Sequence, residues 1–263
     1  MGTLMLTFLT FIEEDNTILE SAASDKYEQD VADYINQFPG VDAKRPKVSS
    51  KYADVLTQFN GAKTWIEVKM NHTDNLGNTR VSYIDGKWTA AQPLDPIKNF
   101  AIEYLTKSKE TQQFLQNIAK HAGISNWKNM TVPSTKGGLS KDNAVTRDQM
   151  ANYFKNRTQY ILNVPNVDLG ELVTNHYLQA KIEPAHYLQA GDDFFMIGTQ
   201  NPLKLSRDIP VLGASGKARG TFKMRIGVRS QFYEVQPEIK ILNMGESPYS
   251  IRPGTKKKNP FER

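Results

Sequence analysis

The chain has 263 residues, of which 39% are hydrophobic and 23% are charged, and it contains no cysteine. This composition is typical of a soluble globular protein, built as one elaborated domain or as a core with an appended lobe. Without cysteine, the sequence excludes disulfides, thiolate metal sites and cysteine nucleophiles.

The N-terminal segment gives no membrane or export signal. Its apolar run, residues 4–12, is too short to span a bilayer. No Lys or Arg precedes Lys26, so the run lacks the basic segment of a signal peptide, and Leu6 stands where a myristoylation motif needs Ser or Thr. We therefore expect a cytoplasmic protein with no membrane partner.

Residues 24–38 are predicted to form an amphipathic helix ending at Pro39-Gly40. Apolar side chains recur at helical spacing and would form one buried stripe. These side chains are Tyr27, Val31, Tyr34, Ile35 and Phe38.

Two strand-like runs follow, residues 52–59 and 64–70, joined through Asn60-Gly61. A two-residue type I′ turn would pair Phe59 with Ala62, and Asp54 would then stand opposite Glu67. A four-residue loop would instead place Asp54 opposite Lys69. Both registers keep the three charged groups on one face, because side chains alternate along a strand.

Further along the chain, a tight hairpin is predicted around Asp85-Gly86 and a helical pattern over residues 95–121. Helical signals also occur around residues 147–163, and strand signals dominate residues 177–242. The predicted organisation is a catalytic core (1–125), a polar connector (126–146), a basic α+β lobe that grips or recognises DNA (147–253) and a mobile basic tail (254–263).

The pentapeptide His-Tyr-Leu-Gln-Ala occurs at residues 176–180 and again at 186–190. Two copies of five residues do not define a repeat architecture. The preferred interpretation is coincidence or a local duplication.

Positive charge is concentrated late in the chain. Residues 204–263 contain 13 Lys and Arg against 5 Asp and Glu, although the whole chain carries only +5. Within residues 221–229, basic side chains alternate with apolar ones, which predicts a strand with one face suited to phosphate contacts. A solvated basic edge strand is the alternative. The candidate DNA-binding residues are Lys217, Arg219, Lys223, Arg225 and Arg229.

The predicted hairpin of residues 52–70 carries the candidate catalytic residues Asp54, Glu67 and Lys69. Ile66, Val68 and Met70 form an apolar face, so no hydrophobic pattern explains the acids and the lysine on the other face. Two opposed carboxylates, with Cβ atoms about 5 Å apart, repel each other unless a cation lies between them. Hard carboxylate oxygens favour Mg²⁺ or Mn²⁺. Beside such an ion, a lysine can orient or deprotonate water and counter the charge on a phosphorane.

Three other acid-x-Lys triplets occur in the sequence. Asp42-Ala-Lys44 lies in a Pro-flanked connector and Asp85-Gly-Lys87 lies in a turn. Glu238-Ile-Lys240 lies in a predicted strand but has no partner acid at hairpin distance. Only Glu67-Val68-Lys69 combines a buried strand with an opposed acid, Asp54. A surface ion-pair hairpin is the alternative interpretation.

Asp54 and Glu67-Val68-Lys69, on consecutive strands after a helix, resemble the PD-(D/E)XK nuclease superfamily, which includes type II restriction enzymes, junction resolvases and recombination exonucleases. The similarity covers residues 24–120, and Ala53 replaces the Pro of the motif. It implies an α/β, restriction-endonuclease-like core with a helix-flanked mixed sheet. It also implies Asp54, Glu67 and the Val68 carbonyl as metal ligands, with Glu28 on the preceding helix as a further ligand and Asp30 as the reserve. An ordinary helix-surface glutamate is the alternative interpretation of Glu28.

Together these features predict a Mg²⁺-dependent DNA nuclease of restriction or phage type, with Mn²⁺ able to substitute. The preferred activity is endonucleolytic hydrolysis of phosphodiester bonds in duplex DNA. A homodimer is compatible with this class. An exonuclease or a junction resolvase on the same core is one alternative. A non-catalytic nucleic-acid-binding or structural protein, in which the hairpin acids are merely paired, is another.

Overall fold

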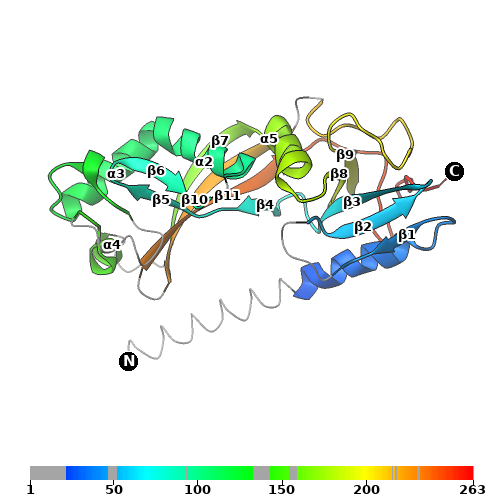
Figure 1. The fold of residues 1–263 in the computed structure, drawn as a ribbon, viewed down its shortest axis with the longest axis horizontal. Coiled ribbons are helices and arrows are strands. Elements are labelled where there is room, and N and C mark those ends of the chain that lie inside the picture. The colour runs from blue at the N-terminus through cyan, green and yellow to red at the C-terminus, as the bar shows by residue number, and fades with distance from the viewer. Residues whose placement is uncertain are drawn as a thin grey trace. The chain divides into compact units, whose positions relative to one another are not determined.

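A computed structural model of the chain describes residues 22–46, 52–92, 94–132, 143–153, 159–214, 216, 218–229 and 232–262. The chain forms two compact units (Figure 1). Unit 1 comprises Met1–His72, Tyr177–Ser215 and Gly245–Arg263, and unit 2 comprises Thr73–His176 and Gly216–Met244. Within the described residues, no helix combines the length and the apolar character needed to cross a membrane.

Unit 1 is built on a mixed five-stranded sheet in the order β1-β2-β3-β8-β9. The central pair, β3 and β8, is parallel, and the other neighbours are antiparallel. The strands are β1 (Asp42–Lys44), β2 (Val55–Phe59), β3 (Ala62–Lys69), β8 (Ala185–Ala190) and β9 (Asp193–Met196).

The β2–β3 hairpin has the register predicted for a two-residue turn. Asn60 and Gly61 have φ values of 51° and 76°, as a type I′ turn requires. Phe59 pairs with Ala62, and the ladder continues to Val55 opposite Ile66. Asp54 therefore stands directly before the first residue of β2, at the level of Glu67.

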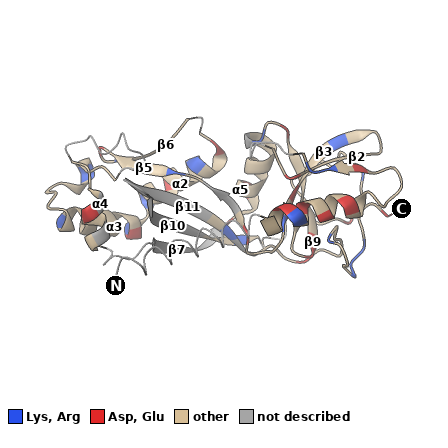
Figure 2. Cartoon of the chain, turned by 90° about the horizontal axis from the view of Figure 1, so that it is seen from below, with Lys and Arg blue, Asp and Glu red and all other residues tan. Residues whose placement is uncertain are grey.

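The predicted N-terminal helix is confirmed over residues 22–35 and lies on one face of the sheet. Val31 and Ile35 are fully buried against Ile66 and Val68, which confirms the apolar face of β3 as core. The helix ends before the predicted Pro39 because the Asn36 side chain exchanges two hydrogen bonds with the Ala43 backbone, both 2.7 Å. Charged residues line this helix (Figure 2).

Unit 2 contains a sheet in the order β6-β5-β11-β10-β7, in which β4 also pairs with β11 and all pairs are antiparallel. The predicted Asp85-Gly86 hairpin joins β5 to β6, with Ile84 paired to Lys87. The strands are β4 (Asn75–Asn78), β5 (Val81–Ile84), β6 (Lys87–Ala90), β7 (Gln159–Asp168), β10 (Arg219–Arg229) and β11 (Phe232–Asn243).

The predicted helical region 95–121 forms two helices that meet at Ser108. Asp95 caps α2 by accepting a hydrogen bond from the Lys98 backbone, and the Ser108 hydroxyl caps α3 in the same way through Thr111. The helices of unit 2 are α2 (Pro96–Lys107), α3 (Lys109–His121), η1 (Trp127–Asn129), α4 (Arg147–Tyr153) and α5 (Gly170–Asn175).

The predicted domain boundaries are wrong. The sequence predicted a core ending at residue 125 and a separate C-terminal lobe, but unit 2 combines residues 73–176, which lie between β3 and β8 in the chain, with residues 216–244, which follow β9. Parallel strands need a crossover connection, and here the crossover includes most of unit 2. The described parts of the predicted connector, residues 126–132 and 143–146, belong to unit 2, where Tyr83 pairs with Val132 and Thr131 with Ala144.

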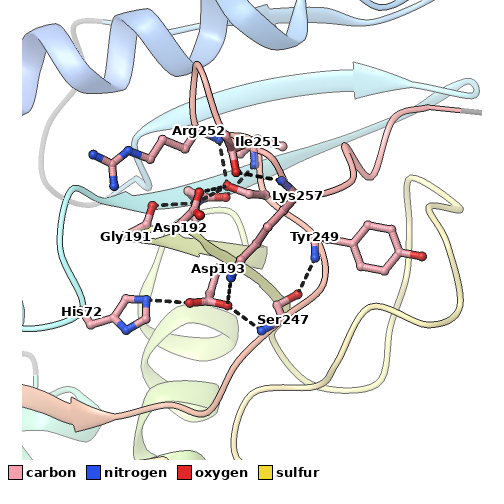
Figure 3. Close-up of polar contacts among 12 residues, drawn as sticks. His72, Gly191, Asp192, Asp193, Ser247, Tyr249, Ile251, Arg252 and Lys257 are labelled. Atoms are coloured by element: carbon pink, nitrogen blue, oxygen red, sulfur yellow. Dashed lines mark hydrogen bonds and ion pairs between the residues drawn. The ribbon is translucent and has the colours of Figure 1, made fainter.

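The predicted mobile tail is wrong as well. Phe261 is 3% exposed in the core of unit 1, and its ring meets that of Phe59 edge to face at 5.3 Å. Buried Asp193 fixes the same segment by accepting hydrogen bonds from Lys257 Nζ (2.7 Å) and from the backbone of Ser247 (2.5 Å), with His72 Nε2 2.9 Å away (Figure 3). The lysine run misled the prediction, because the apolar residues that anchor the segment are widely spaced around it.

Replacing Phe261 with Ala should lower the free energy of unfolding by about 3–5 kcal/mol, because the change removes a buried ring and leaves a cavity. Urea denaturation monitored by fluorescence measures this loss. Lys256→Ala is the control, since Lys256 is exposed in the same segment. Equal stability of the two variants would contradict the packing of the C-terminal segment.

Candidate active site

The structure brings Asp54, Glu67 and Lys69 together at the end of the β2–β3 hairpin. The Val68 backbone N–H donates to Asp54 Oδ2 at 2.8 Å. Lys69 Nζ lies 2.5 Å from Glu67 Oε1 and 4.0 Å from Asp54 Oδ2. The Lys69 ammonium group therefore lies between two carboxylates, and this arrangement follows from the register of the turn.

Burial gives the two carboxyl groups opposite protonation behaviour. Burial, and then the neighbouring charge of Glu67, raises the pKa of Asp54 to about 7, although Lys69 and the Val68 N–H oppose the shift. Burial also pushes the pKa of Glu67 upward, but the charges of Lys69 and Lys181 outweigh it and the pKa is lowered. Two close acids with diverging pKa values are typical of functional sites, although structural ion pairs produce them too.

Lys69 is a charged hydrogen-bond donor in this structure. Burial lowers the pKa of its ammonium group, but the charges of Glu67 and Asp54 and the hydrogen bond to Glu67 outweigh burial and hold the pKa well above its usual value. Lys69 therefore stays protonated and can orient a water molecule or counter negative charge.

The two oxygens of Glu67 differ. Oε1 accepts a hydrogen bond from the Tyr177 hydroxyl at 3.0 Å and contacts Lys69. Oε2 is buried and has no hydrogen-bond partner among the described residues. An ionised carboxylate oxygen without a partner is costly to bury, so a ligand at this atom would remove a penalty.

These atoms fit a hard divalent cation in part. Glu67 Oε2 and the Asp54 carboxylate offer oxygen ligands of the kind that Mg²⁺ and Mn²⁺ prefer. Within the described ranges, however, no group of three or more His, Asp and Glu side chains is arranged to hold a metal ion. Further ligands would have to come from backbone, water or substrate. The Val68 carbonyl stays a prediction in that role.

Glu28, the predicted additional ligand, lies at the edge of the site. It is 9% exposed and close enough to Asp54 to contribute to the raised pKa of that group. Its Oε2 accepts a hydrogen bond from Arg45 Nε at 2.5 Å, and Arg45 also bonds Asp25. Glu28 is thus paired with a cation in this structure. Asp30 on the same helix is more exposed and pairs with Lys26.

The predicted basic strand is β10, which lies between β7 and β11 in unit 2. Lys217 lies outside the described residues, as do the side chains of Lys223, Arg225 and Arg229. The Arg219 side chain is described and forms an ion pair with Asp168. The positive charge concentrated in residues 204–263 does not belong to one lobe, because residues 204–215 and 245–263 are part of unit 1.

Sequence reasoning missed Tyr177, Lys181 and Arg45. Tyr177 and Lys181 follow the first segment of unit 2 in the chain, more than 100 residues after Glu67. The only local signal was the repeated pentapeptide, and its copies differ in structure. Residues His176–Ala180 form a π-helix, whereas residues 186–190 lie in β8. This difference confirms that the pentapeptide does not mark a structural repeat.

Comparison with known proteins gave no family model, no curated protein and no solved structure that matches this chain.

Proposed function

We propose that this chain is a metal-dependent deoxyribonuclease with a restriction-endonuclease-like core in unit 1. The observation that carries the proposal is the buried Glu67 Oε2, which has no hydrogen-bond partner in the part of the chain that the structure describes and lies beside Asp54 and Lys69. In unit 1, a helix precedes the hairpin and the hairpin belongs to a mixed sheet, which is the order of elements that the resemblance implies. Endonucleolytic cutting of duplex DNA is the preferred activity.

In this proposal, Asp54 and Glu67 would hold the metal ion, which would supply an activated water molecule and neutralise charge on the phosphate. Lys69 donates hydrogen bonds through its protonated amine and stabilises the negative charge that develops on the reacting phosphate. Its raised pKa argues against a role as general base. Arg45 and Lys181 add positive charge around the same acids.

A non-catalytic protein with a paired hairpin is the second candidate, and the short Lys69–Glu67 contact favours it. The effect of Mg²⁺ on thermal stability distinguishes the two candidates, because a hairpin whose acids serve only as ion-pair partners is not stabilised by Mg²⁺. Binding of metal to the folded state raises the melting temperature as its concentration passes the dissociation constant.

The test incubates purified protein with closed circular and linear duplex DNA, in Mg²⁺ or in EDTA, and follows the melting temperature in parallel. We expect Mg²⁺-dependent cutting of the circular duplex and a rise in melting temperature with Mg²⁺. Cutting of linear DNA alone would identify an exonuclease. Failure to cut either substrate, with no effect of metal on melting, would contradict the proposed function.

A further inference from the structure

Tyr177 contacts the candidate site from the second segment of unit 1, which begins at this residue. Its side chain is fully buried, and its hydroxyl donates to Glu67 Oε1 at 3.0 Å. Burial and the adjacent Glu67 charge raise the pKa of this hydroxyl well above its usual value, so it remains a hydrogen-bond donor.

Two donors on one oxygen fix the orientation of the Glu67 carboxylate. Lys69 and Tyr177 both approach Oε1, which leaves Oε2 buried and unpartnered among the described residues. A carboxylate with only Lys69 as a partner could rotate and present either oxygen to the cation. The Tyr177 hydroxyl removes that freedom, because it has a fixed direction on a rigid buried ring.

Lys181, four residues after Tyr177, contacts both the Tyr177 ring and the residues that precede Asp54. Its Nζ donates to the Tyr52 carbonyl at 3.1 Å and lies 5.6 Å from the centroid of the Tyr177 ring. This contact ties the segment to the residues that precede Asp54. Lys181 therefore links Tyr177 to the residues that lead into β2.

We infer that Tyr177 is a positioning residue that holds the Glu67 carboxylate with Oε2 turned toward the metal ion. The inference rests on the proposed function. Groups that orient metal ligands through hydrogen bonds typically change metal affinity or activity by about 10–100-fold when they are removed.

The chain offers a matched control in Tyr187, at the same position of the second pentapeptide. Tyr187 is also fully buried in unit 1, and its hydroxyl donates to Asn201 Oδ1 at 2.6 Å. Tyr177→Phe and Tyr187→Phe each remove one buried hydroxyl and its hydrogen bond to a side-chain oxygen, and Tyr187→Phe also removes the bond that the Leu203 backbone N–H donates to that hydroxyl. A purely structural effect should therefore appear in both variants.

The experiment measures Mn²⁺ binding by calorimetry in the absence of DNA, followed by kcat and KM for DNA cleavage. Tyr177→Phe should weaken Mn²⁺ binding about tenfold and lower kcat, with KM for DNA within about twofold of wild type. Tyr187→Phe should leave Mn²⁺ binding unchanged. In a Glu67→Gln background, adding Tyr177→Phe should change Mn²⁺ binding no further, because the group being positioned is already altered.

If wild type binds Mn²⁺ and cuts DNA but Tyr177→Phe behaves like wild type, the inference is overturned and the proposed function stands. Equal losses of Mn²⁺ affinity in both tyrosine variants also overturn it, because they indicate a general loss of stability. Wild type that neither binds Mn²⁺ nor cuts DNA overturns the proposed function itself.

Discussion

Replacing Glu67 with Gln is expected to reduce Mg²⁺-dependent DNA cleavage by a factor of about 10²–10³ or more, the size of effect seen when one charge-stabilising group is lost from an active site. Gln keeps the shape of the side chain and can still accept hydrogen bonds. It lacks the charge that would bind a metal at Oε2. Cleavage is measured on a closed circular duplex under conditions of excess protein.

The same substitution should lower stability. Glu67 is buried and Lys69 is largely buried, and without Glu67 the lysine keeps the more distant Asp54 carboxylate at 4.0 Å, so the cost is at most about 3–5 kcal/mol. The double variant Glu67→Gln/Lys69→Met removes both charges and should recover much of that stability. Its cleavage should stay low, which separates loss of chemistry from loss of fold.

Glu238→Gln is the matched control, because Glu238-Ile-Lys240 repeats the acid-x-Lys pattern on β11 of unit 2. This variant should cut DNA like wild type. Normal cutting by Glu67→Gln together with inactivity of Glu238→Gln would show that the wrong triplet was chosen.

The hairpin and its core face were predictable because they depend on local chemistry. Asn60-Gly61 tolerates positive φ at both positions, and this fixes a register in which Asp54 reaches the level of Glu67. Alternation along β3 then separates Ile66 and Val68 from Glu67 and Lys69. Each step needs only the conformational preferences of a few neighbouring residues.

The other half of the site was not predictable because it depends on long-range pairing. β8 pairs with β3 only after residues 73–176 of unit 2, and Tyr177 directly follows this segment. One pentapeptide adopts a π-helix in its first copy and a strand in its second, so tertiary context decides its structure. The tail, residues 254–263, was mispredicted for a similar reason, since its composition is basic but Asn259 and Phe261 within it are buried.

The remaining large effect concerns the protonation of Asp54. Its pKa is raised to about 7 by burial and by the neighbouring acids, whereas an aspartate in an unfolded chain titrates near pH 4. Between about pH 4 and 7 the folded state binds more protons than the unfolded state, so this group lowers the free energy of unfolding as the pH rises. The loss is complete above pH 7 and amounts to about 4 kcal/mol at most.

Asp54→Asn removes this penalty and still offers an oxygen to the Val68 N–H. In EDTA, the variant should melt near wild type at pH 5 and several degrees above it at pH 8. Addition of Mg²⁺ at pH 8 should raise the melting temperature of wild type and leave the variant unchanged, because the ionised carboxylate is the expected ligand. A variant that melts well below wild type in EDTA at pH 8 would identify Asp54 as a structural ion-pair partner of Lys69, and the hairpin would then need no metal to explain its two acids.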